Sequence, residues 1–202
     1  MTITDKLIKQ INTAIRESDI GFIQKLIATG FDVNQKLENG ETLLWIAAEF
    51  GNEAVTRFLI EHGADVNVKN ELGMTPLFEC WANEQVAEIL IEHGANVNER
   101  SNDKKTPLHF ANSGLDEVLV KHGADVNARD NTGRTPLFEP MYVFDNVEVT
   151  RDIMQTLLEH GADVNIQDNH GKTCLEYVQE RIDAGYKDLK IVKELLLSYG
   201  TK

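Results

Sequence analysis

Apolar residues recur at helical spacing along the chain, in short segments that are separated by polar turns. Within residues 53–61, Val55, Phe58 and Leu59 fall on one face of a helix. Gly63 follows this segment closely, and glycine often closes a helix because it adopts the left-handed conformation at little cost. The pattern therefore predicts a helix over 53–61 that ends just before Gly63.

A shorter apolar segment precedes this helix. Ala47 and Ala48 belong to it, and they are small enough to allow close contact between helices. Thr42 is well placed as the N-cap of this first helix, and Asn39-Gly40 is a turn dipeptide. In later units a proline follows the threonine, at the first helical position where its missing N–H is tolerated. Each unit is thus predicted to contain a turn, a first helix and a second helix.

The unit repeats at a nearly constant interval. A pentapeptide close to Gly-Ala-Asp-Val-Asn begins at positions 30, 63, 94, 123 and 161, so its spacings are 33, 31, 29 and 38 residues. Thr-Pro-Leu runs in phase with it from Thr75, Thr106 and Thr135, and we expect Thr106 to cap its helix as Thr42 does. A period near 33 residues predicts a stack of supersecondary units in which each contacts its neighbours.

These two motifs together resemble the ankyrin repeat. Asp-x-x-Gly-x-Thr-Pro-Leu, which here runs from Asp130 to Leu137, stays in phase with Leu-x-x-x-Gly-Ala-Asp-Val-Asn over nearly the whole chain. The resemblance implies an all-α ankyrin-repeat solenoid of stacked helix-turn-helix units with β-hairpin-like loops. We expect a single domain over 1–202, with an N-terminal cap, four central repeats and a C-terminal cap at 5–34, 35–67, 68–98, 99–127, 128–165 and 166–202.

Two central repeats are shorter than this pattern. The repeat that begins at Thr75 lacks two residues between its helices, and Trp81 stands where ankyrin repeats usually have a small alanine. The repeat that begins at Thr106 is four residues short, which predicts stubby helices. We expect each deletion to tilt the stack locally.

The repeat that begins at Thr135 is instead five residues longer than the 33-residue norm. Pro140 falls inside its expected first helix, where a proline costs about 3 kcal/mol or forces a break. We expect an irregular loop over 140–147, which carries Tyr142 and Phe144. Two interpretations stay open: these aromatic side chains form an exposed binding hot spot, or they fold back and fill the gap left by the broken helix.

The chain is acidic, with a formal net charge of −13 from 33 acids and 20 bases. This charge argues against nucleic acid or an anionic membrane as the partner, and it is compatible with a basic protein. The hairpin tips hold eight bases and six acids, a net +2, which leaves −15 on the other 172 residues. We therefore expect near-neutral tips and an acidic surface on the second helices. The tips are residues 36–41, 69–74, 100–105, 129–134 and 167–172.

Motifs for catalysis, cofactor binding or metal binding are missing from the sequence. It has no Gly-rich phosphate loop, nucleophile elbow, zinc-ligand spacing or nucleotide fingerprint. His62, His93, His122 and His160 recur just before the repeat glycine, but equivalent positions of stacked helices lie about 8–10 Å apart, too far to share one ion. We expect each to interact with the C-terminal end of its helix. By resemblance, His109 is a structural hydrogen-bonding residue.

The cysteines and the apolar segments bear on the compartment. Cys80 and Cys174 follow no metal or redox spacing, so we interpret them as reduced, packed thiols. No apolar run approaches the roughly 18 residues of a membrane span, and residues 1–9 lack the pattern of a signal peptide. We expect a cytoplasmic protein, or one in a host cytosol if the chain is a secreted effector.

The resemblance implies a non-catalytic protein-binding module, a monomer when free, whose partner lies on the concave surface of hairpin tips and first helices. The alternative is a dedicated acidic inhibitor or immunity protein that neutralises one toxin or enzyme, and a third class is a structural scaffold. We expect no catalytic residue, cofactor or metal. The candidate contact residues are Glu38, Glu41, Ile46, Glu49, Phe50, Glu71, Met74, Glu79, Ala82, Asn83, Lys104, Lys105, Asn131, Arg134, Tyr142, Phe144 and His170.

Overall fold

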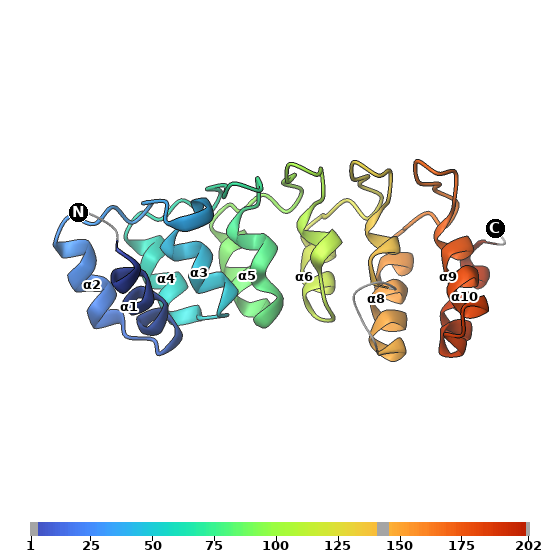
Figure 1. Cartoon of the computed structure of the whole chain (residues 1–202), viewed down its shortest axis with the longest axis horizontal. Coiled ribbons are helices and arrows are strands. Elements are labelled where there is room, and N and C mark those ends of the chain that lie inside the picture. The colour runs from blue at the N-terminus through green and yellow to red at the C-terminus, as the bar shows by residue number, and fades with distance from the viewer. Residues whose placement is uncertain (1–3, 141–145, 201–202) are drawn as a thin grey trace. The chain divides into compact units, whose positions relative to one another are not determined.

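The computed structural model describes residues 4–140 and 146–200, and at positions 38 and 82 it describes the backbone alone (Figure 1). Within these residues the regular elements are helices, together with one isolated antiparallel bridge between Gln167 and Thr173. The expected all-α fold class is confirmed. The chain divides into two compact units, 1–102 and 103–202, which we call the N-terminal and C-terminal units.

The N-terminal unit contains the first helices and turns of the pattern. In the element names, α marks an α-helix and η a 3-10 helix. In chain order its elements are α1 (Asp5–Arg16), α2 (Ile20–Ala28), η1 (Glu38–Gly40), α3 (Leu43–Glu49), α4 (Glu53–Glu61), η2 (Pro76–Ala82) and α5 (Glu84–Glu92).

The C-terminal unit continues the alternation of short first helices and longer second helices. Its described elements are η3 (Pro107–Phe110), α6 (Leu115–Lys121), η4 (Pro136–Phe138), α8 (Val147–Glu159), α9 (Cys174–Asp183), η5 (Lys187–Leu189) and α10 (Lys190–Gly200). The helix α8 begins at Val147, where the irregular loop was expected to end.

The second helices have the ends that their sequences predict. Helix α4 has the predicted bounds, and the side chain of Asn52 accepts the N–H of Val55 at 3.0 Å at its start. Gly63 follows its end with a φ of +88°, in the left-handed region that glycine favours. Asn83 and Asn146 cap the starts of α5 and α8 in the same way.

The first helices of the Thr-Pro repeats, η2, η3 and η4, are 3-10 helices of seven, four and three residues. Thr42 does cap α3, because its Oγ1 accepts the N–H of Trp45 at 3.3 Å. The side chains of Thr75 and Thr135 form no such bond. In the tighter 3-10 turn, the N–H groups of Phe78 and Phe138 donate to the carbonyl oxygens of these threonines instead, at 3.0 Å in both repeats. The four-residue deletion and Pro140 explain why η3 and η4 are shorter than α3.

Thr106 stands at the N-cap of η3, as expected, and forms a capping box with the side chain of His109. Its hydroxyl lies 3.0 Å from Nδ1 of the buried His109, and the same nitrogen accepts the N–H of Thr106 at 3.0 Å. Nδ1 is therefore an acceptor and Nε2 carries the proton, which it donates to the carbonyl oxygen of Arg134 at 3.3 Å. His109 thus joins its own helix to the next hairpin, the structural role that the resemblance implied.

Each described hairpin turn bonds to the next one within its unit. In the N-terminal unit, the N–H of Glu71 donates to Asn39 O and that of Asn102 to Leu72 O, both at 2.9 Å. In the C-terminal unit, Asn169 N–H donates to Thr132 O at 2.8 Å. These bonds satisfy backbone groups that would otherwise depend on solvent.

The core lies between the helices of successive repeats. Ala47 and Ala48 on α3 are completely buried, as their small size predicted, and Val55 and Leu59 on α4 are buried with them. Among the described residues, none of the helices has both the length and the apolar character that crossing a membrane would require.

Candidate partner-binding surface

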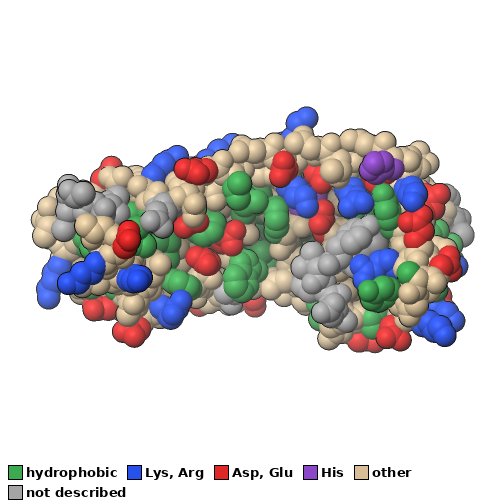
Figure 2. Space-filling model, viewed as in Figure 1, with side chains coloured by type: hydrophobic (Ala, Val, Ile, Leu, Met, Phe, Trp, Pro, Cys, Tyr) green, Lys and Arg blue, Asp and Glu red, His purple; other side chains and the backbone are tan. Residues whose placement is uncertain are grey.

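Two large hydrophobic side chains are exposed in the repeat 68–98 of the N-terminal unit. Leu72, at the hairpin tip, is 60% exposed, and Trp81, on the first helix η2, is 52% exposed. Figure 2 shows that hydrophobic side chains lie among acidic ones on the N-terminal part of the visible face. An exposed tryptophan is typical of the centre of a protein-binding surface.

Trp81 is positioned by a carboxylate on its own helix. Its Nε1–H donates to Oε2 of Glu79 at 3.1 Å, so the edge of the indole ring and the carboxylate lie together. Burial raises the pKa of the Glu79 carboxyl above its usual range, the bond from Trp81 opposes this, and repulsion from Glu49 on α3 adds to it. We call Glu49, Glu79 and Trp81 the Trp81 patch.

Phe50 and Asn83, two other candidates of this unit, are engaged by neighbouring repeats. The guanidinium of Arg16, on α1, lies 4.7 Å from the centre of the Phe50 ring. Asn83 accepts the N–H of Gln85 at 2.9 Å and donates to the carbonyl oxygen of Gly51 at 3.1 Å. Both residues therefore help to hold the repeats together, and a partner could still reach Phe50, which is half-buried.

The remaining candidates of the N-terminal unit divide by exposure. Ile46 was expected to contact a partner, but it is 4% exposed and belongs to the core, because the next repeat packs against its helix. That expectation was wrong. Glu71 is exposed and Glu41 and Met74 are half-buried, so their positions are compatible with contact. The side chains of Glu38 and Ala82 lie outside the described residues.

In the C-terminal unit, two candidates are occupied by internal ion pairs. Lys105 Nζ lies 2.8 Å from Oε1 of Glu139. Arg134 Nε lies 3.5 Å from Oδ2 of the buried Asp168, and its guanidinium lies 4.8 Å from the Tyr177 ring. These two bases therefore hold the fold together, while Lys104, Asn131 and His170 are exposed. Tyr142 and Phe144 lie outside the described residues, so both interpretations of that segment stay predictions.

Bases at the hairpin tips frequently bind the following repeat. Lys36 Nζ donates to Lys69 O at 2.8 Å, and Lys69 Nζ lies 2.8 Å from Oε1 of Glu99, whose pKa this bond lowers. Arg129 donates to Gln167 O at 2.8 Å. The positive charge of the tips therefore serves in part to join repeats.

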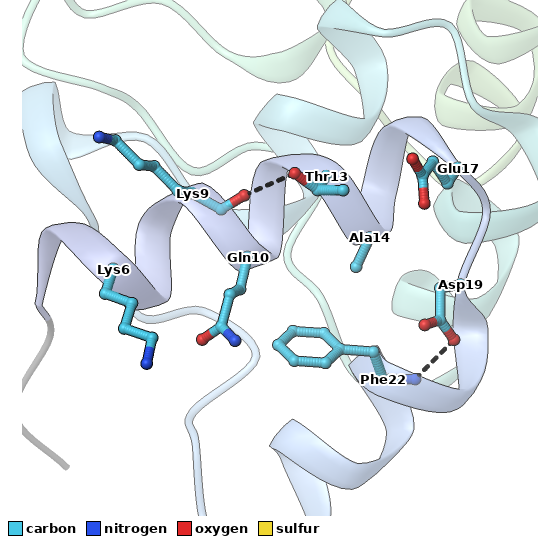
Figure 3. A pocket seen from close by; sticks show the side chains of 8 residues that line it. All are labelled: Lys6, Lys9, Gln10, Thr13, Ala14, Glu17, Asp19 and Phe22. Carbon is cyan, nitrogen blue, oxygen red and sulfur yellow. Dashed lines mark hydrogen bonds between the residues drawn. The ribbon is translucent and has the colours of Figure 1, made fainter.

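The surface formed by the described residues contains several hollows. A wide, open one of about 540 Å³ lies between α1 and α2. Figure 3 shows Lys6 and Lys9 on α1 at its border, and Asp19, whose carboxylate accepts the N–H of Phe22 at 2.9 Å. Its lining is largely of exposed polar side chains, which suits the outer surface of a capping unit.

A smaller hollow of about 250 Å³ lies in the C-terminal unit, beside the shortened helix η3. Leu108, Pro136 and Ile153 line it, and the pair formed by Lys105 and Glu139 borders it. Phe110 and Pro140 also line the hollow, which therefore lies between the first helices η3 and η4 and helix α8.

The repeated histidines serve the ends of their helices. Nδ1 of His62 and of His93 lies 2.7 Å from the carbonyl oxygen four residues earlier, and His160 Nδ1 lies 2.8 Å from Thr156 O. This is the interaction with the helix C-terminus that the sequence predicted. Among the described side chains, His, Cys, Asp and Glu nowhere form a group of three that could hold a metal ion.

Trp81 and Leu72 were missing from the residues predicted from sequence. The signal for Trp81 was present, because a large aromatic residue stands at the alanine position of a repeat that lacks two residues. Shortening the turn makes η2 a 3-10 helix with a non-helical bend at Cys80, and the side chain at 81 lies largely in solvent. For Leu72, the sequence indicates a place at a hairpin tip but no other feature that would identify it as exposed.

Comparison with known proteins agrees with this architecture. A family model for ankyrin repeats matches residues 11–101 and 97–168. An ankyrin repeat-containing protein of Schizosaccharomyces pombe is 34% identical over 58 residues, which are 29% of this chain and 28% of that protein. The ankyrin repeat protein FPV222 of fowlpox virus is 34% identical over 77 residues, 38% of this chain and 10% of that protein.

A further relative is a much longer protein of a different kind. The potassium channel AKT1 of Oryza sativa is 38% identical over 63 residues, 31% of this chain and 7% of the channel. The chain therefore spans less than a third of the length of each of these relatives, and what it shares with them is the repeat. With the family model matching most of its length, the chain belongs to the ankyrin-repeat family.

Proposed function

We propose that this chain is a non-catalytic module that binds another protein on its hairpin turns and first helices. Ankyrin repeats are generally protein–protein interaction modules. The observation that supports the surface is the exposure of Leu72 and Trp81, at 60% and 52%, in the repeat 68–98 of the N-terminal unit. Tryptophan is among the residues that supply most of the binding free energy at protein interfaces.

The proposal includes a free monomer in the cytoplasm. Cys80 and Cys174 are both buried free thiols, and burial raises the pKa of each well above its usual range. Such thiols are unreactive packing residues, which suits a reducing compartment.

A comparative affinity capture from the native cell tests the proposed surface. The bait is used as the wild type, as a surface variant, Leu72→Ser with Trp81→Ala, and as a control, Arg57→Ala with Glu61→Ala on the exposed side of α4. We expect the wild type and the control to retain the same partner and the surface variant to lose it. Retention by the surface variant together with loss by the control would place the partner on the second helices and contradict the proposal.

The net charge of −13 also favours a second function, that of an acidic inhibitor of one enzyme or toxin. The two functions differ in what binding does to the partner. Once the partner is purified, its activity is measured with and without a stoichiometric amount of this chain. Complete loss of that activity supports the inhibitor, and unchanged activity supports a module that only binds.

A further inference from the structure

We propose that the Trp81 patch receives a lysine or arginine side chain of the partner protein. The inference rests on the proposed function and deepens it, because it assigns the chemistry of the partner at one position. Three groups take part: the exposed indole ring of Trp81 and the carboxylates of Glu79 and Glu49.

A related arrangement occurs inside the same chain, although its ring, Phe110, stands at the repeat position of Ile46 and not at that of Trp81. Glu139 occupies the same place in its repeat as Glu79 does, four residues after the Thr-Pro threonine. Lys105 Nζ lies 2.8 Å from Oε1 of Glu139 and 5.4 Å from the centre of the Phe110 ring. Carboxylate, aromatic ring and ammonium group therefore already form such a set in the C-terminal unit.

The N-terminal unit has a carboxylate at the position of Glu139 but an acid in place of the lysine. Lys105 is the residue before Thr106, in the repeat that precedes Glu139. The corresponding position before Glu79 is residue 41, which is Glu41. Within 4–140 and 146–200, no Lys, Arg or His side chain lies within ion-pair distance of Glu79 or Glu49.

The charges of Glu79 and Glu49 also favour a cation at the patch. Glu79 is half-buried, repulsion from Glu49 adds to the cost of its charge, and both effects raise its pKa. A cation at this point would offset both, whereas an apolar side chain of the partner would bury the two charges further at a high cost. The indole face adds a cation–π attraction, for which Trp is the strongest of the aromatic side chains. A basic side chain is therefore the occupant that fits the patch.

The patch can be tested with small probes that carry one charge. The cationic probe is Nα-acetyl-arginine amide, and the neutral probe is Nα-acetyl-citrulline amide, which has nearly the same shape. The chain has two tryptophans, so a ¹⁵N-labelled sample gives two indole N–H signals, and the buried Trp45 serves as an internal reference. We expect the Trp81 signal alone to shift saturably with the arginine probe. No shift, or the same shift with both probes, would overturn the inference.

Two variants test which groups act. Glu79→Gln keeps an acceptor for the indole N–H but removes the charge, and we expect it to weaken probe binding about tenfold, the loss of one charge-assisted contact. Glu41→Lys places a cation at the repeat position of Lys105 and should abolish the response to the probe. The control Glu61→Gln, an exposed acid on α4, should leave it unchanged. Equal binding by all three variants would contradict the assignment.

The native partner separates this inference from the proposed function. If Trp81→Ala weakens the complex while Glu79→Gln and Glu41→Lys leave its affinity unchanged, the surface is right and the basic side chain is wrong. If Trp81→Ala also leaves it unchanged, the surface itself is wrong. We expect all three to weaken the complex.

Discussion

The side-chain amide of Asn67 donates to the carbonyl oxygen of Gly94 at 3.0 Å, and so ties one repeat to the next. The amide oxygen of Asn67 completes the link by accepting the N–H of Asn96, also at 3.0 Å. The same pair of bonds recurs at Asn34 in the N-terminal unit and at Asn127 in the C-terminal unit. At these three positions the last residue of the repeat pentapeptide therefore links one repeat to the next.

Replacing this link should destabilise the N-terminal unit. We expect Asn67→Ala to lower the free energy of unfolding by about 1–2 kcal/mol, since two hydrogen bonds are lost. Asn165 is a matched control, because it ends the same pentapeptide but, among the described residues, bonds only within its own turn, to Asp163. Asn165→Ala should have the smaller effect in chemical denaturation. Equal effects would mean that the bonds between repeats add little.

Gly133 and Gly171 form a second matched pair. Both have positive φ, +80° and +75°, so alanine is strained at either position. A Cβ at Gly133 would lie 3.0 Å from the backbone nitrogen of Asn169, whereas a Cβ at Gly171 would meet nothing within 4 Å. We expect Gly171→Ala to cost about 1 kcal/mol and Gly133→Ala at least about 1 kcal/mol more. Thermal unfolding measures both, and similar melting temperatures would refute the close approach of the two hairpins.

Asp168 should make stability depend on acid pH. Burial raises its pKa, but bonds from the Tyr177 hydroxyl at 2.7 Å and from backbone N–H groups outweigh burial and leave the pKa below its usual range. The carboxylate therefore stabilises the fold above the ordinary aspartate pKa of about 3.9, and this contribution is lost as pH falls through the lowered value. We expect Asp168→Asn to cost roughly 1–2 kcal/mol at pH 7 and less as the solution is acidified.

Asp130 provides the control for that experiment. In another hairpin the turn is already built by an asparagine, since Asn70 accepts the N–H groups of Leu72 and Met74 at 2.9 and 3.0 Å. Asp130→Asn should therefore keep its turn bonds and cost less than Asp168→Asn. If the two variants lose equal stability at pH 7, then Tyr177 and Arg134 do not contribute through Asp168.

Asp116 should have the opposite pH dependence. Burial raises its pKa, and bonds from the backbone of Glu117 and Gly114 and from Thr156 only partly offset this. The penalty is absent below the ordinary aspartate pKa, grows as pH rises towards the raised value, and is complete above it. We expect Asp116→Asn to stabilise the protein by roughly 1 kcal/mol at pH 7. The gain should vanish in acid, and Glu194→Gln, at an exposed acid on α10, should show no gain at either pH.

The sequence predicted the second helices better than the first helices. The bounds of α4 follow from local signals, an asparagine cap and a closing glycine, which act within a few residues. The first helices depend on the length of the connection to the second helix: η2 stops where two residues are missing, and η3 is four residues long. A deletion is visible in a sequence. Whether it shortens the helix or turns it into a tighter 3-10 helix depends on how the repeat packs against its neighbours.

The candidate surface was harder to predict for the same reason. Ile46 and Trp81 stand at first-helix positions, yet the structure buries Ile46 and exposes Trp81. Ile46 is covered because a neighbouring first helix packs on α3, and Trp81 is exposed because its own helix is distorted. Likewise, Lys105 and Arg134 were expected to meet a partner, but acids of the following repeats hold them. Exposure is set by contacts between repeats, which single positions do not reveal.

Hydrogen–deuterium exchange of this chain, with and without its partner, tests most directly the claim that binding takes place on the hairpin turns and first helices. The account predicts that the partner slows exchange over the hairpin and first helix at 69–82, where Leu72 and Trp81 are exposed, and leaves α4 and α5 nearly unchanged. Slower exchange confined to the exposed sides of α4 and α5, with none at 69–82, would contradict it.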